Sequence, residues 1–179
     1  MRLALFGLLV GVTALTLAQH SPYAGEATHP IKSLSPKEVE AYLGGAGMGF
    51  AKAAELNHYP GPRHVLDLAE QLHLTTEQTQ KARVLYDAMK AEAISLGTRI
   101  VEEEQSLDRL FAMQHITREQ LEATTNRIAV LQGQLRVTHL LAHLSMKEIL
   151  TQEQIEKYDE LRGYTAPDNT KSKEHQRHH

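Results

Sequence analysis

The sequence has no cysteine and no tryptophan, and 5% of its residues are aromatic. Without cysteine the chain can form no disulfide and offers no cysteine nucleophile, so helix packing or oligomerisation must supply its stability. Neither sign of charge dominates, since 19 basic residues stand against 22 acidic ones for a net charge of −3. That balance gives no indication of a nucleic-acid partner. At 179 residues the chain is long enough for one modest domain.

The amino terminus has the pattern of a secretory signal peptide. Met1 and Arg2 precede an apolar run over residues 3–17, which ends in the small residue Ala18. We therefore predict that residues 1–18 are a signal peptide and that the mature, exported chain begins near Gln19. A membrane anchor is the alternative, but about 15 apolar residues are fewer than the roughly 20 that span a bilayer. No cysteine follows the cleavage site, which excludes lipid attachment there.

One short pattern occurs three times, at residues 74–78, 116–120 and 150–154. Each copy has an aliphatic residue, a threonine, and a glutamine three positions after the threonine. The threonine hydroxyl can accept from the backbone N–H of the glutamine, while the glutamine side chain accepts from the threonine N–H. This capping box is typical of a helix start. The residues that carry it are Leu74, Thr75, Gln78, Thr117, Gln120, Leu150, Thr151 and Gln154.

The segments between these starts predict two long helices. About 38 and about 33 residues separate the successive starts, without proline and rich in good helix formers. Because the break at residues 113–117 is short, the fold class is all-α, with a long antiparallel helical hairpin. Apolar residues recur at steps of seven, but small and polar members weaken the seam. We therefore expect a second chain or neighbouring helices to complete the core. Gly97 and Gly133 lie at nearly the same level, which predicts a bend in both rods and a curved hairpin.

Shorter segments flank the hairpin. We predict a flexible leader at 19–34, an all-helical domain at 35–163 and a disordered, histidine-containing tail at 164–179. Within the domain, short helices are expected at 35–43, 50–56 and 62–72, and a last helix after Thr151 that ends at Gly163. The glycine-rich stretch at 44–49 has no preceding strand and no closing Gly-Lys-Ser/Thr. A helix break with close backbone packing is therefore favoured over a phosphate-binding loop.

A pair of histidines suggests a metal site. His139 and His143 are four residues apart and would stack on one face of the second long helix. Antiparallel register places Glu92 opposite His139, and two imidazoles with a carboxylate could hold zinc, nickel or cobalt. The plainer alternative is that these side chains hydrogen-bond across a polar layer of the seam. His175, His178 and His179 in the tail could also bind a divalent metal loosely, or be a solvated end.

Charged residues have mostly structural interpretations. Glu102 and Glu104 fit a solvated helix face, whereas Glu103 falls on the seam and can pair with Arg127 by the same register. An acidic metal site is the less favoured alternative for these glutamates. No nucleophile stands beside a base at a sharp turn, and no cofactor loop is present, so we expect the protein not to be an enzyme.

An exported, proline-poor helical chain with repeated Leu-Thr-x-x-Gln resembles the periplasmic Spy/CpxP family, to which the metal-linked ZraP and CnrX proteins are related. The resemblance covers about residues 62–162 and is carried by the copies at 74–78 and 150–154. It implies a thin, curved homodimer in the periplasm whose concave face holds non-native proteins without ATP. Some members of the family damp or sense envelope stress, and some bind zinc, nickel or cobalt. The glycine-rich stretch has no counterpart in this resemblance.

Together these observations predict an ATP-independent periplasmic holding chaperone or envelope-stress accessory protein. Its partners would be non-native client proteins, a second copy of the chain and an envelope sensor protein, with no nucleic acid and no required cofactor. The alternative is a periplasmic heavy-metal sensor or scavenger that uses His139, His143 and Glu92. A purely structural partner of an envelope receptor is a third hypothesis.

Overall fold

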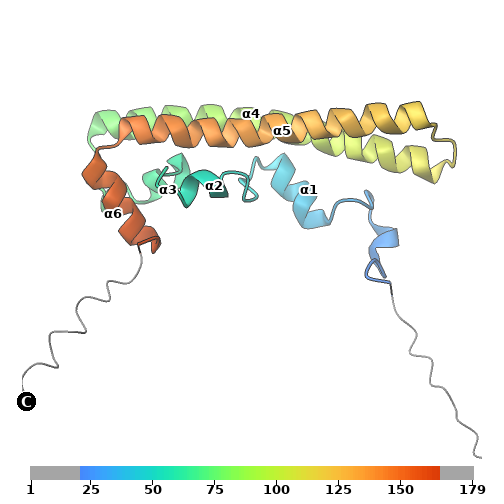
Figure 1. Ribbon diagram of the computed structural model, residues 1–179, viewed down its shortest axis with the longest axis horizontal. Helices are drawn as coiled ribbons and strands as arrows, with labels where there is room; N and C mark the ends of the chain where they lie inside the picture. The colour runs from blue at the N-terminus through green and yellow to red at the C-terminus, as the bar shows by residue number, and fades with distance from the viewer. Residues whose placement is uncertain (1–20, 166–179) are drawn as a thin grey trace, which may run out of the picture.

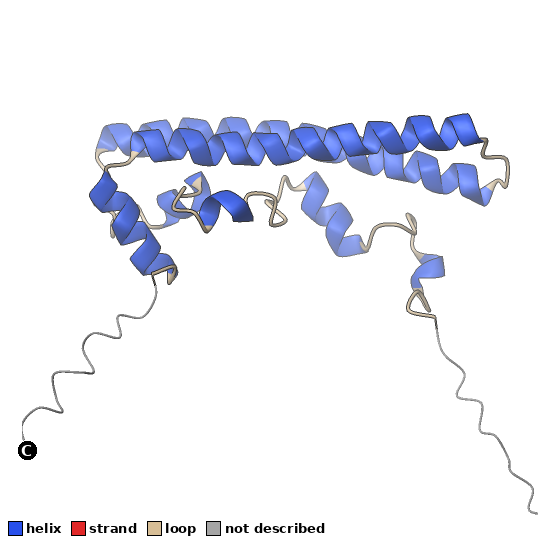
Figure 2. Ribbon diagram, viewed as in Figure 1, coloured by secondary structure: helices blue, strands red, loops and turns tan. Residues whose placement is uncertain are grey.

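The computed structural model describes residues 21–165, and these are all helical, without a strand in that range (Figures 1 and 2). The elements are η1 (Glu26–Thr28), α1 (Pro36–Leu43), α2 (Lys52–Glu55), α3 (Pro62–Asp67), α4 (Thr76–Ala112), α5 (Arg118–Ile149) and α6 (Gln152–Arg162). The predicted all-α fold class is confirmed. The predicted signal peptide and most of the predicted tail, residues 166–179, lie outside the described residues.

The hairpin of α4 and α5 dominates the molecule, as predicted (Figure 1). Its helices have 37 and 32 residues and run side by side, and the chain reverses between Met113 and Thr117. Gln114 has a φ of 56° within this turn. Each of the three predicted threonine–glutamine pairs forms a complete capping box at the start of α4, α5 or α6. These helices therefore begin where the repeated pattern places them.

An ion pair confirms the predicted register of the two rods. The guanidinium of Arg127 donates to both carboxylate oxygens of Glu103, with Nε–Oε1 and Nη2–Oε2 distances of 2.9 Å. Arg127 also donates to the Thr124 hydroxyl on its own helix. A forked contact of this kind is directional, so it favours one alignment of the two helices.

Short helices complete the weak seam within the same chain. α1, α2 and α3 lie along one side of the hairpin, and α6 folds back from the end of α5 at the open end (Figure 1). The core has two parts. The middle part contains Ile31, Leu34, Tyr42, Ala93, Leu96, Ile100, Leu131 and Leu135, and the part at the open end contains Val65, Leu72, Ala82, Met146, Leu150, Ile155 and Tyr158. Neighbouring helices therefore supply the packing that the seam lacks.

α1 has its predicted bounds, with Ser35 as the cap and Leu43 as the last residue, but α2 and α3 are shorter than predicted. α2 covers four residues instead of seven, and α3 ends at Asp67, although Leu72 beyond it is buried at 2% exposure. Turns follow both helices, and His58 and His73 adopt positive φ angles of 65° and 49° there. A residue with a left-handed backbone conformation ends a helix, but neighbouring side chains such as that of Leu72 can still pack into the core.

Residues 31–34, which the sequence assigned to a flexible leader, pack on the hairpin. Ile31 and Leu34 are 5% and 7% exposed. Lys32 pairs with Asp108 on α4 at 3.1 Å, and the Ser33 hydroxyl donates to Glu104 at 2.7 Å. The prediction relies on the polar residues and prolines of the segment. It does not account for Ile31 and Leu34, which pack in the same core cluster as residues of α4.

The two mid-helix glycines have different surroundings. Both helices run through their glycine without interruption. A Cβ on Gly97 would lie 2.1 Å from the Tyr42 carbonyl oxygen, whereas a Cβ on Gly133 would meet no atom within 4 Å. Gly97 therefore lets the end of α1 approach the α4 backbone, and Gly133 has no neighbour that requires a glycine.

Substitution of each glycine by alanine should separate these roles. Gly97→Ala should lower the free energy of unfolding by about 1–3 kcal/mol, since the methyl group would displace α1. Gly133→Ala should raise it by roughly 0.5–1 kcal/mol, because alanine is the better helix former. Urea unfolding followed by circular dichroism measures both. Equal effects of the two substitutions would contradict the packing role of Gly97.

Candidate functional site

The first and third copies of the repeated pattern contact each other directly. Gln78 Nε2 donates to Gln154 Oε1 at 2.8 Å, and Gln154 Nε2 donates to Gln78 Oε1 at 3.1 Å. The remaining amide hydrogens reach the Ile149 carbonyl at 3.0 Å and the Leu72 carbonyl at 3.2 Å. Each Oε1 also accepts from the backbone N–H of its own capping threonine. We call this reciprocal amide pair the glutamine clasp.

The glutamine clasp joins the start of α4 to the start of α6 across the open end of the hairpin. Sequence reasoning gave Gln78 and Gln154 a capping role and missed their pairing. The sequence carried a signal for this pairing: the first and third copies begin helices at the open end of an antiparallel hairpin, whereas the second copy, Thr117–Gln120, caps α5 at the turn. A repeated side chain that caps two helices meeting at one end can also bridge them.

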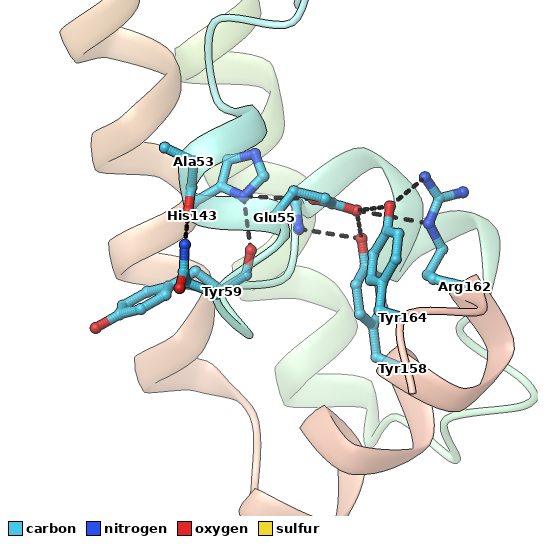
Figure 3. Close-up of polar contacts among 9 residues, drawn as sticks. Ala53, Glu55, Tyr59, His143, Tyr158, Arg162 and Tyr164 are labelled. Atoms are coloured by element: carbon cyan, nitrogen blue, oxygen red, sulfur yellow. Dashed lines mark hydrogen bonds and ion pairs between the residues drawn. The ribbon is translucent and has the colours of Figure 1, made fainter. Parts of the chain in front are cut away.

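Glu55 on α2 holds the carboxyl-terminal part of the chain against the hairpin (Figure 3). Its Oε1 accepts from the hydroxyls of Tyr158 at 2.5 Å and Tyr164 at 3.0 Å, and it lies 3.5 Å from Arg162 Nε. Its Oε2 lies 3.6 Å from His143 Nδ1. Burial and the hydrogen bond to Glu55 raise the pKa of Tyr158, so this hydroxyl stays a donor. The Glu55 cluster is thus a structural tie between α2, α5 and α6.

A second tie lies beside it. His58 Nδ1 is 2.6 Å from Asp159 Oδ2, and Asp159 is 5% exposed. His58 belongs to the turn after α2, and Asp159 belongs to α6. The two contacts, from Glu55 and His58, attach α2 to α6 without a covalent link.

His139 and His143 are both buried on α5, with 5% and 9% exposure. His143 Nδ1 lies 2.7 Å from the Tyr59 carbonyl oxygen, which can only accept (Figure 3). His139 stacks on Phe50 with ring centroids 6.2 Å apart, and its Nε2 has no hydrogen-bond partner in the described part of the chain. Burial and the neighbouring His143 lower the pKa of His139, which favours the neutral ring.

Glu92 does not join the histidine pair. It lines a surface hollow with Val130 and Gly133, whereas the histidines line a pocket of about 250 Å³ beneath the glycine-rich stretch. Within residues 21–165, no group of three or more His, Asp or Glu side chains is arranged to hold a metal ion. The antiparallel register predicts how far along the hairpin Glu92 lies, but it does not predict which side of α4 the Glu92 side chain occupies. The tail histidines lie outside the described residues.

The glycine-rich stretch packs against α4, in line with the favoured interpretation. Gly45 has a φ of 61°, and a Cβ there would lie 3.0 Å from the Ile94 side chain and 3.1 Å from the Lys90 carbonyl. It follows α1, so no strand leads into it. The stretch is therefore a helix break with close backbone packing.

An apolar stripe follows the outer side of α5. Val130, Val137, Leu141 and Leu144 are 59%, 52%, 55% and 48% exposed. At 100° per residue the stripe is centred about 150° from the buried face of the helix. We call these four residues the α5 stripe. Exposed aliphatic side chains that share one side of a helix are a candidate interaction surface.

Charged side chains border the α5 stripe. Two surface hollows between α4 and α5 are lined by Val130 together with Arg99 from α4. One also contains the Glu103–Arg127 pair, and the other contains Glu92 and Val137. The surface therefore combines aliphatic contacts with charges of both signs.

Residues 62–162 match the family described as "LTXXQ motif family protein". Comparisons with the curated proteins and with the solved structures give no match. Among the described residues, no helix is both long enough and apolar enough to cross a membrane.

The glutamine clasp should show energetic coupling. Gln78→Ala should lower the free energy of unfolding by about 1–3 kcal/mol, because it removes the donor to the Ile149 carbonyl and both hydrogen bonds to the Gln154 amide. A double-mutant cycle of Gln78→Ala and Gln154→Ala should give a coupling of about 1 kcal/mol. The control cycle pairs Gln78→Ala with Gln120→Ala, at opposite ends of the hairpin, and should be additive. Coupling of similar size in both cycles would contradict the clasp.

His139 should make stability depend on pH. Its lowered pKa means that the unfolded chain binds the proton more readily, so stability is complete above the usual pKa of 6.5 and falls at lower pH. The free energy of unfolding should fall less steeply between pH 6 and pH 5 in His139→Leu, by up to about 1.4 kcal/mol per pH unit. Urea unfolding across that range measures it, with His115→Leu in the turn as the control. If the free energy of unfolding of His139→Leu depends on pH as that of the unchanged protein does, His139 is not the residue responsible for the loss of stability.

Proposed function

Because the chain belongs to the LTXXQ motif family, which includes Spy/CpxP-like and ZraP-like proteins, we propose that it is an ATP-independent periplasmic holding chaperone. The observation that carries this proposal is the α5 stripe. Its four aliphatic side chains are about half exposed or more and lie on the side of α5 opposite the residues that this helix buries. Such a surface offers apolar area to the exposed hydrophobic segments of a partly unfolded client.

The chemistry of this surface favours weak and unselective binding. Burial of aliphatic area supplies attraction at roughly 25 cal/mol per Å² and has no directional requirement. Arg99, Glu103 and Arg127 beside the stripe supply charges of both signs, which raise encounter rates with differently charged clients. No bound nucleotide and no catalytic residue is needed for this activity. A client would be released when it folds and buries its own apolar residues.

The α5 stripe is also where a second copy of the chain would pack. Positions 130, 137 and 144 are separated by seven residues, the repeat of coiled-coil contacts. A homodimer formed through one part of the stripe would leave the rest and the bordering hollows for clients. An envelope sensor protein could compete for the same surface, which would couple client load to a stress response.

Zinc, nickel or cobalt sensing through His139, His143 and Glu92 has less support. Glu92 lines a different hollow from the histidine pair. The metals named prefer sites completed by imidazole, carboxylate or water ligands, and no carboxylate among the described residues lines the histidine pocket.

Substitution of the α5 stripe tests the chaperone proposal. The variant Val130→Asn/Val137→Asn/Leu141→Asn should suppress aggregation of a client at least about tenfold less well, since each side chain contributes roughly 1 kcal/mol when half buried. Reduced lysozyme is a suitable client, because the cysteine-free chain is unaffected by the reductant. Light scattering measures the aggregation. The fold should persist, because the replaced side chains are exposed and only Leu141→Asn lowers helix propensity, by roughly 0.5 kcal/mol.

A matched control changes three exposed polar residues on α6 instead: Gln152→Asn, Glu153→Gln and Glu156→Gln. This variant should suppress aggregation as the unchanged protein does. Sedimentation analysis of both variants reports whether the stripe also holds a second copy. Full suppression of client aggregation by a correctly folded stripe variant would contradict the chaperone proposal.

A further inference from the structure

Cationic side chains border the cavity of about 250 Å³ beneath the glycine-rich stretch, which we call the histidine pocket. Its charged lining residues are Arg63 and His64 of α3 and Lys90 of α4. Within residues 21–165, no aspartate or glutamate lines this pocket. Burial and the charge of Arg162 lower the pKa of His64, so positive charge from α6 also acts here. A cavity with this lining attracts an anion and repels a cation.

The positive charge extends beyond the histidine pocket. A second hollow, between α3 and α4, shares Arg63 and Lys90 with it and adds Arg83 and Asp67. Asp67 Oδ2 lies 3.9 Å from Arg63 Nε, which is too far for a hydrogen bond. Neither Arg83 nor Lys90 forms an ion pair within the described part of the chain. The three cations therefore carry more charge than the carboxylate beside them neutralises.

The glycine-rich stretch keeps the cavity open but does not itself cradle an anion. The N–H groups of residues 44–46 already donate to carbonyl oxygens of α1. Gly47 lines the pocket, and a Cβ there would meet no atom within 4 Å. Gly61 lines it as well, and a Cβ at this position would lie 2.9 Å from His143 Cε1. Glycines thus leave the space free, and side chains of α3 and α4 supply its charge.

A phosphate group matches this lining better than a carboxylate does. A guanidinium has paired N–H donors that fit two phosphate oxygens, and an ammonium group adds a compact positive charge. A phosphate monoester carries close to two negative charges at neutral pH, which Arg63 and Lys90 together can balance. The cavity is slightly smaller than the roughly 300–1,000 Å³ of drug-sized ligand sites, so it favours a compact ligand.

We propose that the histidine pocket binds one phosphate monoester group, with Arg63 and Lys90 as its charged partners. Arg83 in the adjoining hollow draws anions toward the site. The phosphate can belong to a small soluble molecule or to a lipid headgroup, because both present the same terminal oxygens. No residue of the α5 stripe lines either hollow, so this proposal and the chaperone proposal can fail independently.

Isothermal titration calorimetry of the full chain with glycerol 2-phosphate, at physiological ionic strength, tests the site. We expect one site per chain. Binding should weaken at least about tenfold in Arg63→Gln/Lys90→Gln, because this variant removes both charges assigned to the phosphate. Sodium acetate under the same conditions should bind at least about tenfold more weakly than glycerol 2-phosphate.

The matched control Lys37→Gln/Arg136→Gln removes the same charge from two exposed positions outside both hollows. It should bind glycerol 2-phosphate as the unchanged protein does, and circular dichroism should show both variants folded. Equal weakening in the two variants would mean that net charge alone attracts the anion, which overturns the proposal. Acetate binding as tight as that of glycerol 2-phosphate overturns the choice of phosphate.

Vesicles distinguish the two sources of the phosphate group. Cosedimentation with phosphatidylcholine vesicles that contain phosphatidic acid, lost in Arg63→Gln/Lys90→Gln, supports the site and assigns it a lipid headgroup. Binding of glycerol 2-phosphate without such cosedimentation supports the site and assigns it a soluble ligand. If neither probe binds in a manner that depends on Arg63 and Lys90, the proposal is wrong.

Discussion

The structure depends on two glutamine side chains that pair across the open end of a helical hairpin. Gln78 and Gln154 each cap a helix, bond to each other and bond to a backbone carbonyl of the opposite segment. An amide can serve all these roles because it has two hydrogens to donate and one oxygen that accepts twice. Through this contact the directions of α4, α5 and α6 are set together, and the core at the open end can close.

The remaining elements divide the hairpin into a covered side and a free side. α1 approaches the α4 backbone at Gly97, and Glu55 and His58 tie α2 to α6. These contacts complete the core with residues of the same chain. The α5 stripe remains outside this packing, so its aliphatic residues are available for an interaction surface. The contacts that stabilise the fold and the proposed binding surface therefore lie on different sides of the same long helices.

Local signals predicted the helices well, and pairing across the fold was predicted less well. The capping boxes could be predicted because the interacting atoms are three residues apart. The Glu103–Arg127 pair could also be predicted, because a short turn sets the level of every residue in an antiparallel hairpin. The same rule does not say which side of a helix a residue faces, so it grouped Glu92 with the histidines wrongly. The packing of Ile31 and of Gly97 depends on where α1 lies, which no local pattern states.

The separation of 76 residues between the paired glutamines has a consequence for the order of folding. The two rods can pair from their turn, where contacting residues are close in sequence, but the open end can close only after α6, which follows both rods in the chain. A chain that crosses a membrane amino terminus first would pass through with its base still open. It would acquire its final shape at the destination, once α6 has arrived.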